Sequence, residues 1–196
     1  MSMPRDALTT VSDDALLLLY ARGDGAAARE LTGRLLPRVW NQARRMLGDQ
    51  TEAEDVAQEA MMRLWRMAPD WEQGRAQVST WIFRVTANLC TDRLRKRRVS
   101  ALDEVDEPRD PAPGAEARLQ MQARSDALQA ALDSLPERQR QAVVLRHIEG
   151  LANPEIAEIM EISTEAVESL TARGKRTLAA ALADRRAALG VMNDDG

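Results

Sequence analysis

The segment 99–117 constrains the fold of this chain most, because it divides the sequence into two stretches of different character. It follows a run at 93–98 in which five of six residues are basic, and it holds six acidic residues against a single arginine, Arg109. Three prolines and a glycine in the segment oppose a helix, and few apolar side chains are available for burial. Such a composition predicts a flexible, self-repelling linker. We therefore expect two modules, at residues 12–98 and 118–189.

The composition of both modules favours helices. Hydrophobic residues make up 44% of the 196 residues and aromatic residues only 3%, so the cores must be built mainly from leucine, alanine, valine and methionine. Apolar residues recur at three- and four-residue spacing, which predicts an all-α fold of two small helical domains. Gly48 is expected to end one helix, and Asp49 or Thr51 to cap the next. The expected helices cover residues 13–21, 26–47, 52–67, 80–98, 153–160 and 164–182, with Pro37 kinking or breaking the second.

The overall charge limits the classes of partner. A net charge of −4 and a pI near 5.2 argue against a protein that coats nucleic acid with its whole surface, so any DNA affinity must be local. No apolar run approaches the roughly 18 residues that span a bilayer, and the first residues lack a signal-peptide pattern. We therefore expect a cytoplasmic protein without membrane insertion.

Few residues could support catalysis or metal binding. One cysteine, Cys90, excludes an internal disulfide, and with the single His147 it gives too few ligands for a zinc site. Both side chains are expected to pack or to lie on the surface. His147 has no obvious nucleophile partner, and no Walker-type phosphate loop is present. We expect no enzyme activity and no cofactor.

Residues 153–182 have the pattern of a helix-turn-helix. Asn153 can cap a first helix with Pro154 at its first position, and Ser163 can cap a second helix. Apolar residues follow Val167 at helical spacing, so one face of the second helix is expected to be buried. A charged face that contacts only solvent is the alternative to DNA binding. The residues expected to reach bases or phosphates in a major groove are Ser163, Thr164, Thr171, Arg173, Lys175 and Arg176.

The helix expected at 80–98, with Ser79 as its cap, is a second candidate nucleic-acid site. It combines aromatic rings with cations, as unstacked bases and a phosphate chain require. The alternative is structural, because Trp81 can belong to the core and a basic helix C-terminus is favoured by the helix dipole. The candidate residues are Trp81, Arg84, Asn88, Arg93, Arg95, Lys96, Arg97 and Arg98.

The sequence resembles the extracytoplasmic-function sigma factors of bacterial RNA polymerase over nearly its whole length. The resemblance rests on motifs in a fixed order: LGD, AEDVAQE and LW, then TW, AN and D..R in the next helix, then the acidic linker, and LPERQR before the helix-turn-helix. It implies a sigma region 2 helical bundle at 12–98, an acidic linker at 99–117, and a sigma region 4 helix-turn-helix at 118–189.

The same resemblance implies a role for each part. Asp55, Gln58 and Glu59 would dock on the clamp helices of the polymerase largest subunit. The helix at 80–98 and the loop before it would capture and melt the minus-ten promoter element, with a flipped-out base read beside the loop. The second helix of the helix-turn-helix would lie in the major groove of the minus-thirty-five element, and the linker would run towards the RNA exit path. The implied partners are RNA polymerase core, promoter DNA and an anti-sigma factor.

Two positions depart from the pattern of this family. Members often have a basic residue where Glu168 stands, and a basic or aromatic pair near 172–174. This recognition helix is therefore less cationic than usual, and the bases it reads are not implied by the resemblance. Gly174 also weakens the helix by about 1 kcal/mol relative to alanine.

Two other functions fit parts of the sequence. A helix-turn-helix repressor or activator would bind its promoter as a dimer without polymerase, whereas a sigma factor should bind tightly only with the core enzyme. A protein-interaction adaptor, in which both basic sites are solvated faces, would show no salt-dependent DNA binding.

Overall fold

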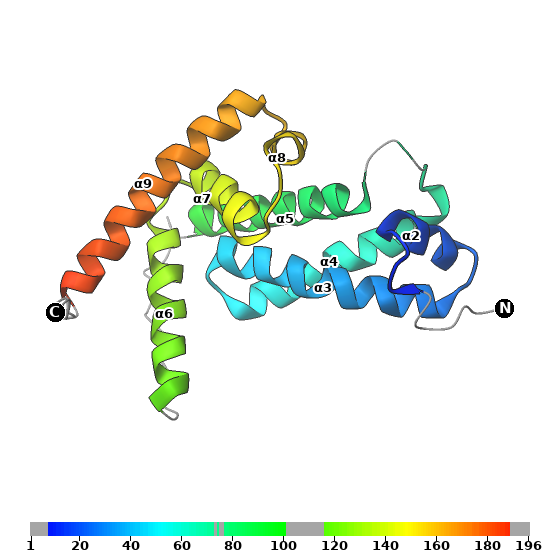
Figure 1. The fold of residues 1–196 in the computed structure, drawn as a ribbon, viewed down its shortest axis with the longest axis horizontal. Coiled ribbons are helices and arrows are strands. Elements are labelled where there is room, and N and C mark those ends of the chain that lie inside the picture. The colour runs from blue at the N-terminus through cyan, green and yellow to red at the C-terminus, as the bar shows by residue number, and fades with distance from the viewer. Residues whose placement is uncertain (1–7, 73, 75–76, 101–115, 189–196) are drawn as a thin grey trace.

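The computed structural model describes residues 8–72, 74, 77–100 and 116–188 of the chain. All regular structure in these residues is helical, so the predicted all-α fold is confirmed. Most of the predicted linker lies outside the described residues, so its conformation stays a prediction. The helices form two groups, one on each side of that segment (Figure 1).

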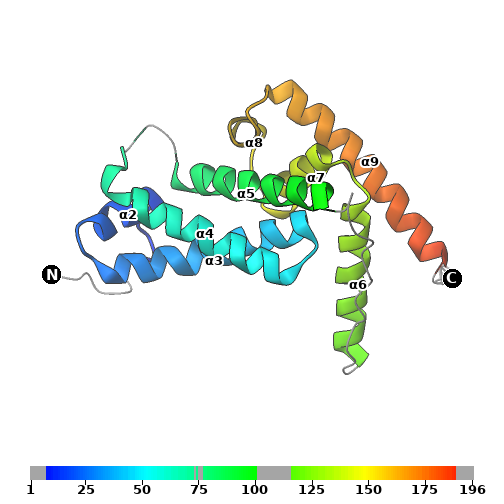
Figure 2. The same cartoon turned by 180° about the vertical axis from the view of Figure 1, so that it is seen from behind.

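The first module is a bundle in which α3, α4 and α5 lie along one another, with α2 across one end (Figures 1 and 2). Its core contains Leu16, Leu31 and Leu64, all fully buried. Helical spacing places these side chains on inward faces, so burial of the amphipathic faces holds the bundle together. The elements are α2 (Asp13–Ala21), α3 (Gly25–Leu47), α4 (Gln50–Met67), a 3-10 turn η1 (Ala68–Asp70) and α5 (Val78–Ser100).

The helix ends in this module confirm some sequence predictions and correct others. Gly48 ends α3 with a left-handed φ of 71°, and the Asp49 carboxylate caps α4 by accepting from the Glu52 amide at 2.9 Å. Pro37 does not break the helix, because α3 continues through it, with Leu35 and Val39 fully buried on either side. The other expected effect of Pro37, a kink, stays a prediction. Ser79 is not a cap, because α5 begins one residue earlier, at Val78.

One arginine ties the start of the chain to α3. The Arg34 guanidinium donates to the carbonyls of Leu8, Thr9 and Val11 at 2.7 to 2.9 Å, and it pairs with Asp13 at 3.0 Å. These bonds satisfy three backbone acceptors that precede α2. The segment before α2 is thereby fixed against the bundle.

The second module contains the predicted helix-turn-helix. Ser163 caps its second helix as predicted, because its hydroxyl accepts from the Ala166 amide at 3.2 Å. The predicted Asn153 cap is wrong. Glu155 folds back and accepts from the Ala152 amide at 2.8 Å, so Asn153 becomes the first helical residue. The elements are α6 (Glu116–Asp133), α7 (Glu137–Val143), a π-helical turn η2 (Val144–Ile148), α8 (Asn153–Met160) and α9 (Thr164–Ala188).

The two modules pack against each other. Phe83 of α5 is fully buried in a cluster that otherwise belongs mainly to the second module, with Leu145 and Ile156 among its members. Polar contacts surround this cluster: Arg98 pairs with Glu137 at 2.8 Å, Arg38 pairs with Glu149 at 3.5 Å, and Arg140 donates to the Met46 carbonyl at 2.7 Å. Two of these residues belong to the LPERQR motif, which therefore contributes to the contact between the modules.

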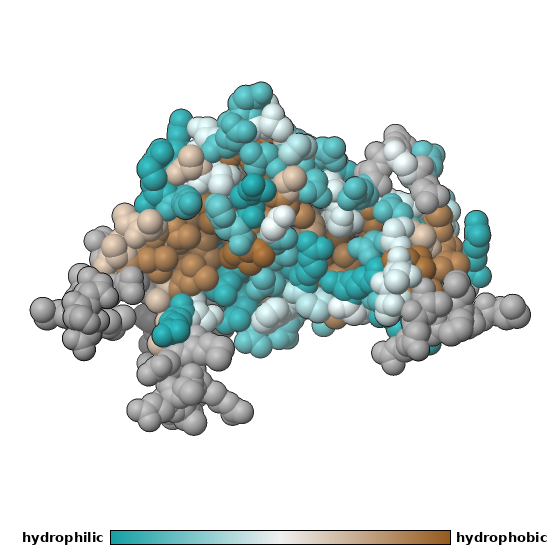
Figure 3. Space-filling model, viewed as in Figure 1, coloured by the Kyte–Doolittle hydropathy of each residue, from teal (hydrophilic) through white to brown (hydrophobic). Residues whose placement is uncertain are grey.

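Hydrophobic surface gathers on one side of the second module. Figure 3 shows it on the left, where α6, α7 and α9 meet. Leu128 and Leu178 are partly buried there against a cluster that includes Leu132 and Val144. The apolar face of α9 is thus only partly covered.

Candidate nucleic-acid and protein interfaces

The outward face of α4 carries the residues predicted to bind polymerase. Val56 and Ala60 are fully buried, and helical geometry then turns Asp55 and Gln58 to solvent, where both are exposed. Glu59 is half-buried and accepts from Arg63 at 2.8 Å. This hydrogen bond lowers the pKa of the Glu59 carboxyl, so the face keeps its negative charge at neutral pH.

The same face includes an apolar residue that was missed from the sequence. Met62 is 48% exposed, and it follows Gln58 by four residues and Asp55 by seven. Residues at these spacings share one side of a helix. An acidic rim beside an exposed methionine is a surface suited to a partner with both basic and apolar groups. The sequence signal for Met62 was the i, i+3, i+7 spacing of Asp55, Gln58 and Met62.

Four of the residues predicted to bind the minus-ten element form one stripe along α5. They are spaced by three, four and seven residues, which is the spacing of a single helix face. Asn88 and Arg95 are exposed, and Arg84 is half-buried. Trp81 is half-buried as well, and its ring packs against the core of the first module. The stripe therefore runs as Trp81, Arg84, Asn88 and Arg95.

The remaining basic residues of α5 lie on other faces. Arg93 pairs with Asp55 of α4 at 3.5 Å, Arg97 pairs with Glu52 at 2.9 Å, and Arg98 pairs with Glu137 of the second module. Arg97 also donates to the carbonyl of Leu47 at 2.9 Å, which is the last residue of α3. Lys96 is exposed, with no ion pair among the described residues. The basic run is thus partly a set of contacts within the protein.

Phe83 gives α5 a second buried side. Figure 1 shows α5 with α3 and α4 on one side and α7 and α8 on the other. Ile82 packs in the core of the first module, while the next residue, Phe83, packs with the second module. The Arg38 guanidinium lies over the Phe83 ring at 4.7 Å from its centroid. Only the Arg84 and Asn88 side of this helix turn remains open.

Three cations of α9, at positions 173, 175 and 176, have no ion pair with another described residue. Arg173, Lys175 and Arg176 are all exposed. At the start of the helix, Ser163 is exposed and Thr164 is half-buried. Thr171 is also half-buried, and its Oγ1 atom is buried without a hydrogen-bond partner among the described residues. The prediction that Thr171 lies on the outward face is therefore wrong, because its position borders the buried stripe that contains Val167 and Gly174.

Gly174 lies where α9 packs closely against α7. A Cβ atom built on it would lie 2.6 Å from Val143 Cγ2 and 3.2 Å from the Gln139 carbonyl oxygen. No side chain fits there unless the Val143 side chain or α7 shifts. The glycine lowers the intrinsic stability of the helix, as the sequence indicated, but it also lets the two helices pack closely.

Two other features lie away from these faces. Cys90 is fully buried, and burial raises the pKa of its thiol to about 12, so it is a protonated packing residue.

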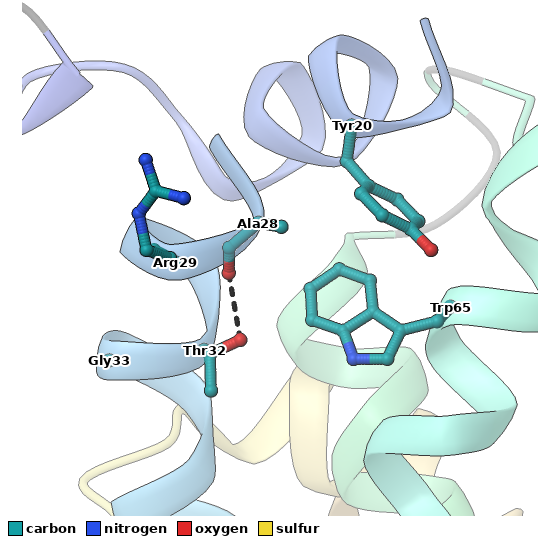
Figure 4. A pocket seen from close by; sticks show the side chains of 6 residues that line it. All are labelled: Tyr20, Ala28, Arg29, Thr32, Gly33 and Trp65. Atoms are coloured by element: carbon teal, nitrogen blue, oxygen red, sulfur yellow. Dashed lines mark hydrogen bonds between the residues drawn. The ribbon is translucent and has the colours of Figure 1, made fainter. Parts of the chain in front are cut away.

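A shallow pocket between α2, α3 and α4 is lined by six residues, none of them predicted as a site (Figure 4). Tyr20 and Trp65 pack there in a tilted arrangement, with ring centroids 4.6 Å apart and ring planes at 59°, and Gly33 is among the lining residues. Among the described helices, none is both long and apolar enough to cross a membrane.

Comparison with known proteins identifies both modules. The family model described as Sigma-70 region 2 matches residues 31–99, and that described as Sigma-70, region 4 matches residues 125–178. The ECF RNA polymerase sigma factor SigM of Mycobacterium tuberculosis is 31% identical over 168 residues, which cover 86% of this chain and 83% of SigM. SigE of Mycolicibacterium smegmatis is 39% identical over 166 residues, which cover 81% of this chain and 63% of SigE.

A solved structure supports the same assignment. CnrH, determined in complex with the cytosolic domain of CnrY, superposes with a TM-score of 0.68 at 27% identity, covering 88% of this chain and 97% of CnrH. The two matched regions occur in the order that the sequence motifs predicted. The chain therefore belongs to the extracytoplasmic-function sigma factors of the sigma-70 family.

Proposed function

We propose that this chain directs the core of bacterial RNA polymerase to specific promoters and helps to open promoter DNA. The observation that carries the proposal is the order of its two sigma regions, each with an exposed helix face suited to its role. We assign the module boundaries to residues 12–98 and 118–189, with the linker at 99–117. An independent helix-turn-helix repressor is not favoured, because the first module also matches a sigma region.

The outward face of α4 is the proposed polymerase contact. Asp55 and Gln58 are exposed, Glu59 stays ionised beside Arg63, and Met62 adds apolar area. A cationic partner surface gains from such a face in both association rate and specificity. The pair between Asp55 and Arg93 is long and exposed, so a partner can replace it at small cost.

The open stripe of α5 is the proposed contact with the melted minus-ten strand. Arg84 and Arg95 can follow the phosphates, and the Asn88 amide offers both a donor and an acceptor to a base edge. Arg93, Arg97 and Lys96 flank the stripe, and the two arginines would exchange carboxylate partners for phosphates. Arg98 is held by the second module in this structure.

The exposed side of α9 is the proposed reader of the minus-thirty-five duplex. In a helix-turn-helix the second helix lies in the major groove, with its N-terminal residues at the base edges. Ser163 and Thr164 stand at that end of α9, and Arg173, Lys175 and Arg176 follow along its length as phosphate or base contacts. Thr171 has no part in this contact, because its hydroxyl is buried.

An anti-sigma factor is a further proposed partner. CnrH, which is similar over 88% of this chain, was solved in complex with the cytosolic domain of CnrY. We assign no enzymatic activity to the chain, since sigma factors are regulatory proteins.

The polymerase contact is tested by reversing charge on α4. The double variant Asp55→Arg, Glu59→Arg should fold and lose most copurification with core polymerase, because two repulsive contacts replace two attractive ones. The matched control is Asp70→Arg, Glu158→Arg, which changes net charge equally at two exposed acids outside α4. Thermal unfolding of both variants verifies the fold, and equal copurification of the two would contradict the assignment of α4.

A further inference from the structure

The first two turns of α9 carry acids where a DNA-reading helix usually carries cations. Glu165 and Glu168 are both exposed, and the first cation after the cap is Arg173. Bringing carboxylates near phosphates costs electrostatic free energy, so they lower affinity for DNA of any sequence. Carboxylates at this end of a DNA-reading helix can contribute to promoter recognition only through specificity.

The two carboxylates differ in their surroundings. A backbone hydrogen bond at the helix start lowers the pKa of the Glu165 carboxyl, and hydrogen bonds with the Ser163 and Thr164 side chains lower it further. The Glu165 carboxylate therefore interacts with groups in the first turn of α9. Glu168 lies one turn further along, beyond those amides. It accepts from the side-chain amide of Asn153 at 3.4 Å, across the turn between α8 and α9.

Asn153 is free for this contact because it does not cap α8. Glu155 satisfies the Ala152 amide in its place, which leaves the Asn153 side chain to reach α9. The contact joins the first residue of one helix to the second turn of the other. It restricts the rotamers of Glu168, which would otherwise be a mobile surface side chain.

The neighbouring outward residues are small. Ser169 and Ala172 follow Glu168 and are exposed, so no long side chain separates this part of α9 from a partner. The helix backbone can approach the floor of a groove closely here. A glutamate at this point has the reach to contact a base edge.

We propose that Glu168 is a specificity-determining residue that accepts a hydrogen bond from the N4 amino group of a cytosine in the minus-thirty-five duplex, with Asn153 as its positioning residue. The inference rests on the proposed function, because it requires α9 in the major groove. An ionised carboxylate can only accept, and the major groove offers amino donors on cytosine and adenine alone. Adenine places its N7 acceptor beside the amino group and repels the carboxylate, whereas cytosine does not.

The test is selection of minus-thirty-five sequences from a randomised library by reconstituted holoenzyme. Wild-type protein should select cytosine at one position, by about 5- to 150-fold over other bases. Glu168→Ala should lose that preference, and Glu168→Gln should shift it towards adenine, which glutamine can contact at N6 and N7. The other positions should keep their preferences.

Two controls separate base reading from charge and from folding. Glu165→Gln removes the same charge one turn earlier, and it should raise affinity for all sequences without changing the preferred bases. Asn153→Ala should weaken selection at the cytosine position alone, while the midpoint of thermal unfolding and the affinity for other sequences stay unchanged. A purely structural role for Asn153 would instead lower the unfolding midpoint.

The results of this selection distinguish failure of the Glu168 inference from failure of the role proposed for α9. Unchanged base preferences in Glu168→Ala would overturn the inference, as would the disappearance of a preference at a position that is not cytosine. A wild-type holoenzyme that selects no upstream sequence at all would overturn the assignment of α9 itself, and the inference with it.

Discussion

The two helices assigned to DNA, α5 and α9, expose their cations in different ways. Four arginines of α5 are in ion pairs, with Asp55, Asp92, Glu52 and Glu137 as partners. In the described part of the chain, the three cations of α9 assigned to DNA have no ion pair. A count of basic residues favours α5 as the stronger DNA site, whereas the structure makes α9 the site whose charge is already available.

The same two helices also differ in how they are buried. Phe83 and Ile82 give α5 two packed sides, one in each module. α9 packs along one side, where Gly174 touches α7. We infer that α5 must exchange contacts within the protein before it can use all its cations, and that α9 needs no such exchange.

The largest effect is expected from Phe83→Ala. Loss of a fully buried phenylalanine costs about 3–5 kcal/mol, and here most of that loss falls on the contact between the modules. Small-angle scattering should show a larger radius of gyration for the free protein. Ile82→Ala is the matched control, because it should lower the free energy of unfolding of the first module without separating the modules. A compact Phe83→Ala protein would contradict the second buried side of α5.

A smaller effect is expected from two glycines, one in each module. Gly174→Ala adds a methyl group 2.6 Å from Val143, so overpacking of about 1–3 kcal/mol should exceed the gain in helix propensity of about 1 kcal/mol. Gly33→Ala adds the same group where nothing lies within 4 Å, so it should stabilise α3 by roughly 0.5–1 kcal/mol. Thermal unfolding measures both. Stabilisation by both substitutions would show that α7 can move away from α9 at no cost.

A third experiment compares the cations of α9 with the ion-paired arginines of α5, and substitutions in the two sets should have different effects. Arg173→Ala, Arg176→Ala should weaken binding of holoenzyme to upstream duplex, and the slope of affinity against salt should fall by about one for each phosphate that is no longer neutralised. Arg93→Ala, Arg97→Ala should leave that slope unchanged and cost up to about 1 kcal/mol of stability per ion pair.

Promoter opening tests the role proposed for α5, and the reactivity of thymines towards permanganate measures that opening. Asn88→Ala is the cleanest variant, because Asn88 is exposed and Trp81 is partly in the core. Normal opening by a folded Asn88→Ala, Arg84→Ala protein would show that the open stripe does not contact the melted strand.

Periodicity predicted the direction of many side chains, because residues on the helix face opposite a buried face must point to solvent. It placed Asp55 and Gln58 outward on α4, and the residue type at the helix start predicted the Ser163 cap. Periodicity could not tell that Ile82 and Phe83 are buried against different modules, since spacing indicates burial but names no partner.

Competition between neighbouring groups explains most of the errors. Asn153 has the chemistry of a cap, but the Glu155 carboxylate occupies the Ala152 amide. Thr171 lies at the border of the apolar stripe, where a small shift in helix packing decides whether a hydroxyl is buried. The pairing of Arg93 and Arg97 with α4 depends on how α4 and α5 pack, which local sequence does not specify.

The smallest effect concerns Glu149, which holds the modules together near Phe83. Burial raises the pKa of its carboxyl, and the charge of Arg38 and the hydrogen bond from Asn41 offset this only in part. When the modules separate, the carboxyl returns to water and its pKa falls towards the ordinary value. Glu149 therefore binds a proton more tightly when the two modules are packed together. The contact between the modules should strengthen as pH falls towards the ordinary pKa of a glutamate, and it should weaken as pH rises through the raised pKa of Glu149.

Scattering at several pH values tests this in a His147→Gln background. His147 must be removed because partial desolvation, together with the charges of Lys175 and Arg146, lowers the pKa of its imidazole. Protonation of His147 therefore has the opposite effect on stability. Glu149→Gln in the same background should abolish the dependence, since the amide does not titrate but can still accept from Asn41. A pH dependence that persists in Glu149→Gln would assign it to another group and would leave Glu149 as a purely geometric contact between the modules.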